Sequence, residues 1–235
     1  MKFIRKGRKP PTLAKFERDN ASTSHMLEYD ALPRIVKREL SNRMLKEQGR
    51  LCAYTMRRIG ANVVAEAPDF HIEHILSRSR RPELQLDYLN MILCAPGVDQ
   101  PVCAWGARLK GNTEVGDSNF VSPLRADCEA RFLYRLDGHL RATDDRDEAA
   151  NSTIKILNLN HRELVEQRLA ALRASGLGPG AIRPVGARAA ARLSKEICLR
   201  SAEGDFAPFC VAIQQAAARL ATKAAQRAAR LRSAR

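Results

Sequence analysis

The chain has 235 residues, of which 45% are hydrophobic and 28% are charged, the composition of an ordinary globular protein. It contains no run of about 18 apolar residues, which excludes a membrane-spanning protein. Lysine and arginine number 40 against 26 aspartate and glutamate, a formal net charge of +14. Such a charge favours a polyanionic partner, most often nucleic acid, over the alternative that it only maintains solubility or matches an acidic protein.

The N-terminus and the cysteines indicate a cellular compartment. Residues 1–11 are basic but lack the apolar segment of a secretory signal. The six cysteines are scattered rather than spaced as a compact disulfide framework. Both observations predict a reducing, cytoplasmic setting.

Positive charge is concentrated at the two ends of the chain, and no acidic residue follows Asp205. The cations concerned are Lys2, Arg5, Lys6, Arg8 and Lys9 at the start, and Arg219, Lys223, Arg227, Arg230, Arg232 and Arg235 at the end. Both ends are therefore candidates for contact with phosphates.

The first half of the chain divides into three kinds of segment. Apolar residues at helical spacing predict a helix over 33–48. Short apolar pieces broken by Gly60 and Pro68 indicate strands and turns over 51–75. Residues 95–125 are rich in Gly, Pro, Asn and Ser, which predicts an irregular region dominated by loops.

The second half begins with a predicted hairpin at 131–141, with Asp137-Gly138 at its turn. Helical periodicity returns beyond Ala149, and Asn160 is the expected N-cap of a helix that ends near Ser175 or Gly176.

After a connector rich in Gly and Pro, two further helices are predicted, over about 185–201 and 206–232. Alanine favours helix strongly in the last one. Its cations Arg219, Lys223, Arg227 and Arg230 share one face by their spacing of three or four. This face is equally compatible with a solvated surface and with one that binds phosphates or a protein partner.

The tetrapeptide His71-Ile72-Glu73-His74 holds two of the five histidines. Its spacing differs from the His-Glu-x-x-His helix of zinc proteases. A carboxylate beside a histidine suits a site in which the carboxylate holds a hard divalent cation and the imidazole takes a proton from water, as phosphodiester hydrolysis requires. The alternative is a polar patch on a strand. Because adjacent side chains of a strand point to opposite faces, the functional interpretation requires the strand to end or bulge here.

Other motifs flank this tetrapeptide in a definite order. They are Gln48 before Cys52-Ala53-Tyr54, Phe70 to Ile75, Leu86 to Cys94, Gly106 to Gly111, Ser122-Pro123-Leu124, Cys128 to Phe132, Asp137-Gly138, and Thr153 to Asn160. In this order the chain resembles the HNH, or ββα-metal, nuclease family, and more narrowly the PtuB-like HNH proteins that accompany retrons and Septu antiphage systems.

The resemblance implies an α+β fold in which a small ββα-metal HNH core is embedded in a mostly helical protein. Four parts are expected. They are an N-terminal basic arm and helix (1–48), the nuclease core (49–126), a hairpin and helix that complete it (127–176), and helices rich in Ala and Arg that bind a partner or nucleic acid (177–235).

The resemblance also assigns roles to the residues that match the family motif. His74 matches the general base, Glu73 the adjacent acidic residue that binds or supports the metal, and Asn90 the asparagine that ties the loop between the strands and orients the base. The expected metal ligands are Glu73, His71 and Asn112, with Lys110 the other polar choice near Asn112. The residues expected to contact nucleic acid are Arg78, Arg80, Arg81, Lys110, Arg219, Lys223, Arg227 and Arg230.

The cysteines depart from the pattern of many HNH proteins, in which two Cys-x-x-Cys pairs bind zinc. Thr55 and Gly97 stand where the second cysteines would follow Cys52 and Cys94, so a four-thiolate site is unsupported. Cys52, Cys94 and Cys103 are more simply buried reduced thiols. The expected cofactor is Mg²⁺ or Mn²⁺, and a structural Zn²⁺ is doubtful.

The implied function is that of an antiphage effector that cuts nucleic acid, with DNA favoured over RNA. The implied partners are a PtuA-like ATPase of the ABC or SMC class and, in a retron, the reverse transcriptase with its RNA–DNA product. The chain has no Walker A motif, so nucleotide dependence would come from a partner. The alternatives are a catalytically inactive HNH scaffold that binds nucleic acid or a partner, and a toxin-like ribonuclease.

Overall fold

The computed structural model describes residues 1–23, 27–61, 68–101 and 103–233. Its helices are α1 (Pro11–Asp19), α2 (Arg34–Glu47), α3 (Gly106–Lys110), α4 (Glu148–Ile156), α5 (Arg162–Ala174), α6 (Ala187–Glu196) and α7 (Cys210–Ser233). Its strands are β1 (His71–His74), β2 (Met91–Cys94), β3 (Phe132–Tyr134) and β4 (Leu140–Ala142). The fold is therefore a mixture of helix and strand with two small antiparallel sheets.

The helix expected over 33–48 is present as α2. Val36, Leu40 and Met44 are buried along one side of it, as the helical spacing predicts. α2 packs near β2, so this helix forms part of the support beneath the first sheet.

The first sheet pairs β1 with β2, and His74, the last residue of β1, lies opposite Met91. Two short 3-10 turns, Pro82–Leu84 and Tyr88–Asn90, lie in the connection. α3 follows β2 within the region expected to be loops. A helix of five residues is too short to produce a recognisable apolar period, which explains why the sequence did not indicate it.

The second sheet is the predicted hairpin β3–β4. Gly138 in its turn has φ +87°, and a Cβ at this position would lie only 2.3 Å from the Val165 carbonyl oxygen. The turn therefore needs glycine both for its conformation and for its close approach to α5. The buried Arg168 donates to the carbonyl oxygens of Gly138 and Leu159, each at 2.6 Å.

The predicted N-cap of the helix after the hairpin was wrong by one residue. His161 is the N-cap of α5, and its Nδ1 accepts from the Glu163 N–H at 3.4 Å. Asn160 instead bonds to the N–H and the carbonyl of Leu140 in β4. Its side chain is used to join the turn before α5 to the hairpin, a tertiary contact that sequence spacing does not reveal.

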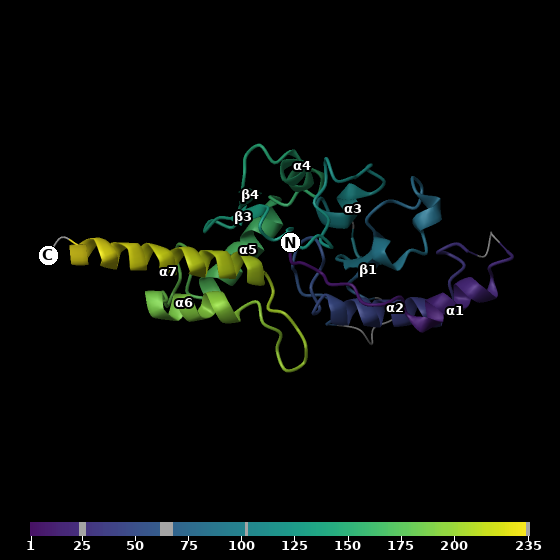
Figure 1. Cartoon of the computed structure of the whole chain (residues 1–235), viewed down its shortest axis with the longest axis horizontal. Coiled ribbons are helices and arrows are strands. Elements are labelled where there is room, and N and C mark those ends of the chain that lie inside the picture. Colours follow the sequence, from purple (N-terminus) through teal and green to yellow (C-terminus); the bar gives the residue numbers. More distant parts are fainter. Residues whose placement is uncertain (24–26, 62–67, 102, 234–235) are drawn as a thin grey trace.

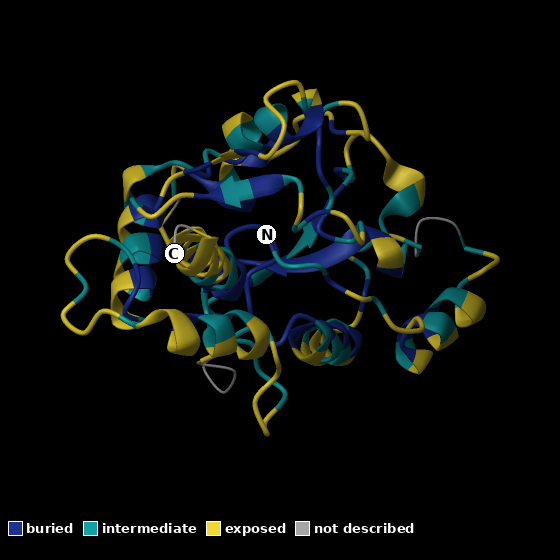
Figure 2. Ribbon diagram, turned by 60° about the vertical axis from the view of Figure 1, so that its left-hand side comes forward, coloured by how far each residue is buried: buried dark blue, intermediate teal, exposed yellow. Residues whose placement is uncertain are grey.

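The main hydrophobic core is shared by segments that are far apart in sequence. It includes Met1 and Ile4 of the N-terminal arm, side chains of α2, β2 and the hairpin, and Cys210 at the start of α7. Figure 2 shows these buried segments gathered around the N-terminus. A second, smaller cluster joins α5, α6 and α7 through residues such as Leu172, Ala190 and Ile213.

The two helices predicted near the C-terminus are present as α6 and α7, with α6 shorter and α7 beginning later than expected. Figure 1 shows α7 lying beside α6 and then projecting from the body, at the end opposite α1. Among the helices in the described ranges, none has the length and hydrophobicity needed to cross a membrane.

Candidate functional site

One cavity is lined by residues that the sequence predicts to be catalytic or to bind a metal. His71, Glu73 and His74 of β1 line it together with Asn112, which follows α3. Residues from the start of the chain, Glu28, Tyr29 and Asp30, and from the connection after β1, among them Arg78 and Gln85, complete its wall. The strand indeed ends at His74, which satisfies the condition that places a neighbouring carboxylate and imidazole in one site.

His74 is almost buried, with 7% of its surface exposed. Its Nε2 lies 2.9 Å from the carbonyl oxygen of Gln85. Because a carbonyl oxygen only accepts, Nε2 carries the proton and donates it, and Nδ1 is left with the free lone pair. Burial lowers the pKa of His74, with the nearby charges of Arg78 and Lys110 adding to the effect, so the neutral imidazole is favoured.

His71 is oriented by the same kind of bond on the opposite nitrogen. Its Nδ1 lies 2.6 Å from the Pro96 carbonyl oxygen and therefore donates to it, which leaves the lone pair on Nε2. That Nε2 is 3.8 Å from Oε2 of Glu73. A histidine that donates one ring N–H to a carbonyl while presenting its other nitrogen is the usual arrangement of a metal ligand.

These contacts fit a hard divalent cation held between His71 and Glu73. Two ligand atoms each about 2.1 Å from an ion are separated by roughly 3 to 4 Å, which includes the 3.8 Å observed. Asn112, the third expected ligand, lines the same cavity. Within the described ranges, no group of three or more His, Cys, Asp or Glu side chains is assembled for a metal.

Lys110 differs from its expected role. The residue is 1% exposed, and its Nζ donates to the carbonyl oxygens of His74, Ile75 and Gly111 at 3.2 to 3.3 Å. It also lies 2.8 Å from Oε1 of Glu73. Lys110, which was expected to contact a phosphate, is instead buried, and its Nζ lies against these four oxygens.

Glu73 Oε1 is buried and forms no hydrogen bond of acceptable angle, even though Lys110 Nζ is close. The pairing is therefore an electrostatic contact rather than a well-directed hydrogen bond. Lys110 thus neutralises the Oε1 side of the carboxylate, and Oε2 is the oxygen that faces His71.

Asn90 joins the two ends of the connection between β1 and β2. Its Oδ1 accepts from the Leu76 N–H at 2.8 Å, and its Nδ2 donates to the carbonyls of Leu76 and Leu84 at 2.9 and 3.3 Å. Asn90 is itself buried. These bonds tie the backbone of Leu76, two residues after His74, to the residue that precedes β2.

Three residues to which the sequence assigned no role also make contacts that position the site. The Gln48 side chain bonds to both the N–H and the carbonyl of Leu93 in β2. Tyr29 meets the His74 ring edge to face, with ring centroids 4.9 Å apart. The Gln85 side chain accepts from the Tyr29 N–H at 3.1 Å. No local pattern identifies Tyr29 or Gln85, because their roles depend on contacts between distant segments.

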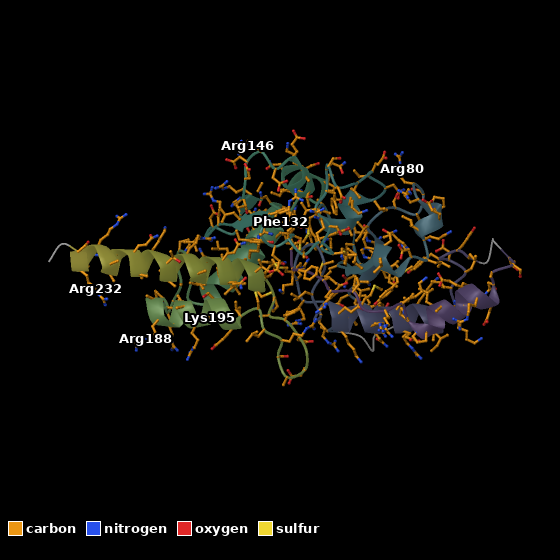
Figure 3. The ribbon with its side chains drawn as sticks, viewed as in Figure 1. Arg80, Phe132, Arg146, Arg188, Lys195 and Arg232 are labelled. Atoms are coloured by element: carbon orange, nitrogen blue, oxygen red, sulfur yellow. The ribbon has the colours of Figure 1, made fainter. Side chains whose placement is uncertain are left out.

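The three arginines after β1 differ in their surroundings. Arg78 lines the cavity and pairs with Asp30 at 2.9 Å. Arg81 pairs with Glu83. Arg80 is exposed, and Figure 3 shows it on the outside of the body, at the opposite end from Arg232. Of these three arginines, Arg78 is the one that lines the cavity that holds His74, together with Arg108 from α3.

The cations of α7 also separate into two groups. Arg219 is partly buried and donates to the Tyr134 carbonyl oxygen, and burial lowers its pKa. Lys223, Arg227 and Arg230 are exposed. The predicted basic face is therefore free only from Lys223 onward.

The cysteines and the single tryptophan are packed within the core. Cys52 and Cys94 are both buried, and Cys103 donates from its Sγ to the Trp105 carbonyl oxygen. Trp105 is 2% exposed, and its indole N–H donates to Glu163 at 2.8 Å. Trp105 therefore belongs to the hydrophobic core.

In comparison with known proteins, neither a protein-family model nor a curated protein sequence matches the chain.

Proposed function

We propose that the protein is a metal-dependent endonuclease of the HNH type, which hydrolyses phosphodiester bonds by attack of water. The observation that carries this proposal is the pair of oriented histidines around Glu73 in one cavity. His71 and His74 each donate one ring N–H to a backbone carbonyl and so keep a defined lone pair. The order of β1, β2 and α3 along the chain also agrees with a ββα-metal core.

In this mechanism His74 is the general base, and its Nδ1 takes a proton from the attacking water. Its lowered pKa keeps it unprotonated near neutral pH. Asn90 is a positioning residue that holds the chain beside it. Arg78, once it releases Asp30, is placed to bind a phosphate of the substrate with its guanidinium.

A divalent cation, Mg²⁺ or Mn²⁺, would be held by His71 and Glu73, with Asn112 as the third candidate. When bound, it would stabilise negative charge on the phosphoryl and leaving oxygens. Glu73 must then share its carboxylate between the cation and Lys110.

The proposed biological role is that of an effector in antiphage defence of the retron or Septu type. Its proposed partner is an ATPase of the ABC or SMC class, with a reverse transcriptase and its RNA–DNA product in a retron. The support for this context is the sequence resemblance. α6 and the exposed part of α7 would supply the surface for a partner or for nucleic acid.

A second candidate function is a non-catalytic HNH scaffold that binds nucleic acid or a partner. The specific observation in its favour is the contact of Lys110 Nζ with Glu73 Oε1 at 2.8 Å. A permanent cation on this carboxylate would replace the metal electrostatically and leave a structural site without its chemistry.

Replacement of His74 tests the proposal. His74→Ala is expected to lower the rate of cleavage of a DNA oligonucleotide by roughly 10² to 10⁴ while the protein stays folded. His139→Ala is the matched control, because the His139 side chain is 52% exposed on the hairpin, where it pairs with Asp137. Unchanged cleavage by purified His74→Ala would overturn the assignment of the base.

Chelation distinguishes the proposed metal-dependent enzyme from the non-catalytic scaffold. EDTA is expected to stop cleavage and to leave the circular dichroism spectrum unchanged, since His71 and Glu73 would form an open site rather than a structural zinc cage. Loss of the fold together with activity would contradict this site and indicate a structural metal. Absence of cleavage with Mg²⁺, Mn²⁺ or no metal would favour the scaffold.

A further inference from the structure

The segment 28–30 lines the candidate site, although it comes from the N-terminal part of the chain. The edge-to-face contact between Tyr29 and His74 joins rings 4.9 Å apart. The backbone N–H of Tyr29 donates to the side chain of Gln85, whose own carbonyl oxygen holds His74 Nε2. One residue, Gln85, therefore connects the segment and the imidazole.

The same segment also contacts the guanidinium of Arg78. The Asp30 carboxylate lies 2.9 Å from an Arg78 guanidinium nitrogen, and the guanidinium stacks 4.8 Å from the centre of the Tyr29 ring. Lys37 lies over Tyr29 as well, at 5.0 Å. A carboxylate on this guanidinium stands where the phosphate of a nucleic-acid backbone would bind, since both anions match the planar fork of arginine.

The anchoring of the segment is modest. The side chain of Asp30 is 76% exposed and that of Arg78 is 39% exposed, and exposed ion pairs of this kind are weak. Lys37 Nζ donates to the Asp30 carbonyl oxygen at 3.3 Å, which holds the backbone against the start of α2. A polyanion that offers several phosphates would therefore compete effectively with one carboxylate.

We infer that the segment 28–30 is a self-inhibitory cover, in which Tyr29 restricts access to His74 and Asp30 occupies the phosphate-binding guanidinium of Arg78. A strand of nucleic acid displaces Asp30 and exposes the imidazole. This inference rests on the proposed nuclease function, because it assigns His74 and Arg78 their substrate. It adds that the isolated chain is held in a restrained state.

The reactivity of His74 toward diethyl pyrocarbonate measures the cover without requiring cleavage. The full-length protein is treated with the reagent, and the rate of modification at each histidine is read by peptide mass spectrometry. Tyr29→Ala is expected to speed modification of His74 by roughly two- to tenfold, the range set by removal of one aromatic edge-to-face interaction. Tyr29→Phe keeps the ring and is expected to react like the wild type, and the exposed His139 is the internal control in every sample.

Binding of a short DNA oligonucleotide tests the proposed role of Asp30. Asp30→Asn is expected to strengthen binding by about two- to fivefold at low salt, since it removes the anion paired with Arg78. Glu28→Gln is the matched control, because it changes the net charge equally and lies in the same wall of the cavity. It is expected to have a smaller effect, because Glu28 is exposed and the carboxylate that pairs with Arg78 is that of Asp30.

The outcomes separate this inference from the proposed function. Faster modification of His74 in Tyr29→Ala together with faster cleavage supports the cover. Unchanged modification in a folded Tyr29→Ala protein overturns it, and so does slower cleavage, which would make Tyr29 a positioning residue for His74. Equal gains in Asp30→Asn and Glu28→Gln would overturn the role of Asp30. If no variant cuts DNA, the nuclease proposal fails, and modification and binding still decide the cover.

Discussion

The two ends of the chain are both rich in lysine and arginine, but these cations have different surroundings in the structure. At the N-terminus Lys2 pairs with Glu129 at 2.7 Å, Lys6 with Glu47 at 3.2 Å, and Lys9 with Glu17 at 2.8 Å. Lys6 also lies 3.5 Å from the centre of the Tyr88 ring. This arm is part of the folded body, and much of its charge is neutralised there.

At the C-terminus the charge stays accessible. From Lys223 onward the cations of α7 are exposed, and within the described ranges none of them forms an ion pair. Figure 3 shows Arg232 on α7, and Arg188 and Lys195 on α6, around the projecting pair of helices. The comparison teaches that a cluster of cations indicates a polyanion-binding surface only where the fold leaves it without internal carboxylates.

The largest expected effect is on stability, and it concerns Lys110, a lysine that is buried inside the fold. Lys110→Met is expected to lower the free energy of unfolding by about 3 to 5 kcal/mol, because it leaves Glu73 and three carbonyl oxygens without their buried cation. Chemical denaturation monitored by circular dichroism measures this change. Lys223→Met on exposed α7 is the control, with an expected change below about 0.5 kcal/mol. Equal effects of the two substitutions would contradict the division between used and free cations.

The second prediction concerns the pH dependence that Lys6 gives to the N-terminal arm. Burial lowers the pKa of Lys6 from 10.5 to about 8, against the opposing attraction of Glu47. Between these two pH values the unfolded chain retains a proton that the folded chain has lost, so the free energy of unfolding should rise with pH. Between the two pKa values of Lys6, the free energy of unfolding should rise by about 3 kcal/mol, at roughly 1.4 kcal/mol for each pKa unit.

This contribution is measured as a difference between proteins, because other groups also titrate at high pH. Denaturation curves at pH 7.5, 9 and 10.5 are compared for the wild type and Lys6→Met. The wild type is expected to gain stability relative to Lys6→Met as the pH rises. A constant difference between them would show that Lys6 titrates normally and that the arm is less buried than the structure indicates.

The third prediction concerns nucleic-acid binding by α7. Replacing Lys223, Arg227 and Arg230 by Gln is expected to reduce the slope of log affinity against log salt by about 2 to 3, at roughly 0.9 for each phosphate of duplex DNA that the variant no longer neutralises. Fluorescence anisotropy of a labelled duplex at several salt concentrations provides the slope. An unchanged slope would assign α7 to a protein partner or to solubility instead.

The matched N-terminal variant has the smallest expected effect on binding. Lys2, Lys6 and Lys9 are replaced by Gln together, which removes as many positive charges as the α7 variant. Because these lysines already pair with carboxylates, the salt slope should change by well under 1. A reduction as large as that of the α7 variant would show that both basic ends bind phosphates and would remove the distinction between them.

Several features of the fold follow from local sequence and are present as predicted. The apolar spacing around Leu40 is sufficient for α2, because a helix of 14 residues displays its period over several turns. The Asp137-Gly138 turn specifies the hairpin, because only glycine adopts the required φ beside α5 without strain. The tetrapeptide at His71 also marks the cavity, since β1 places its polar side chains there.

Other features were decided only when distant segments packed together. The side chain of Asn160 bonds to β4 instead of capping α5, and α3 turns Lys110 inward to Glu73. Tyr29 reaches His74 across many intervening residues. Sequence alone thus determined which residues are capable of the chemistry and which segments are regular, because both depend on side-chain type and local spacing. Tertiary structure decided which charges are free and which polar groups meet, because burial and long-range contact set the availability of a charge.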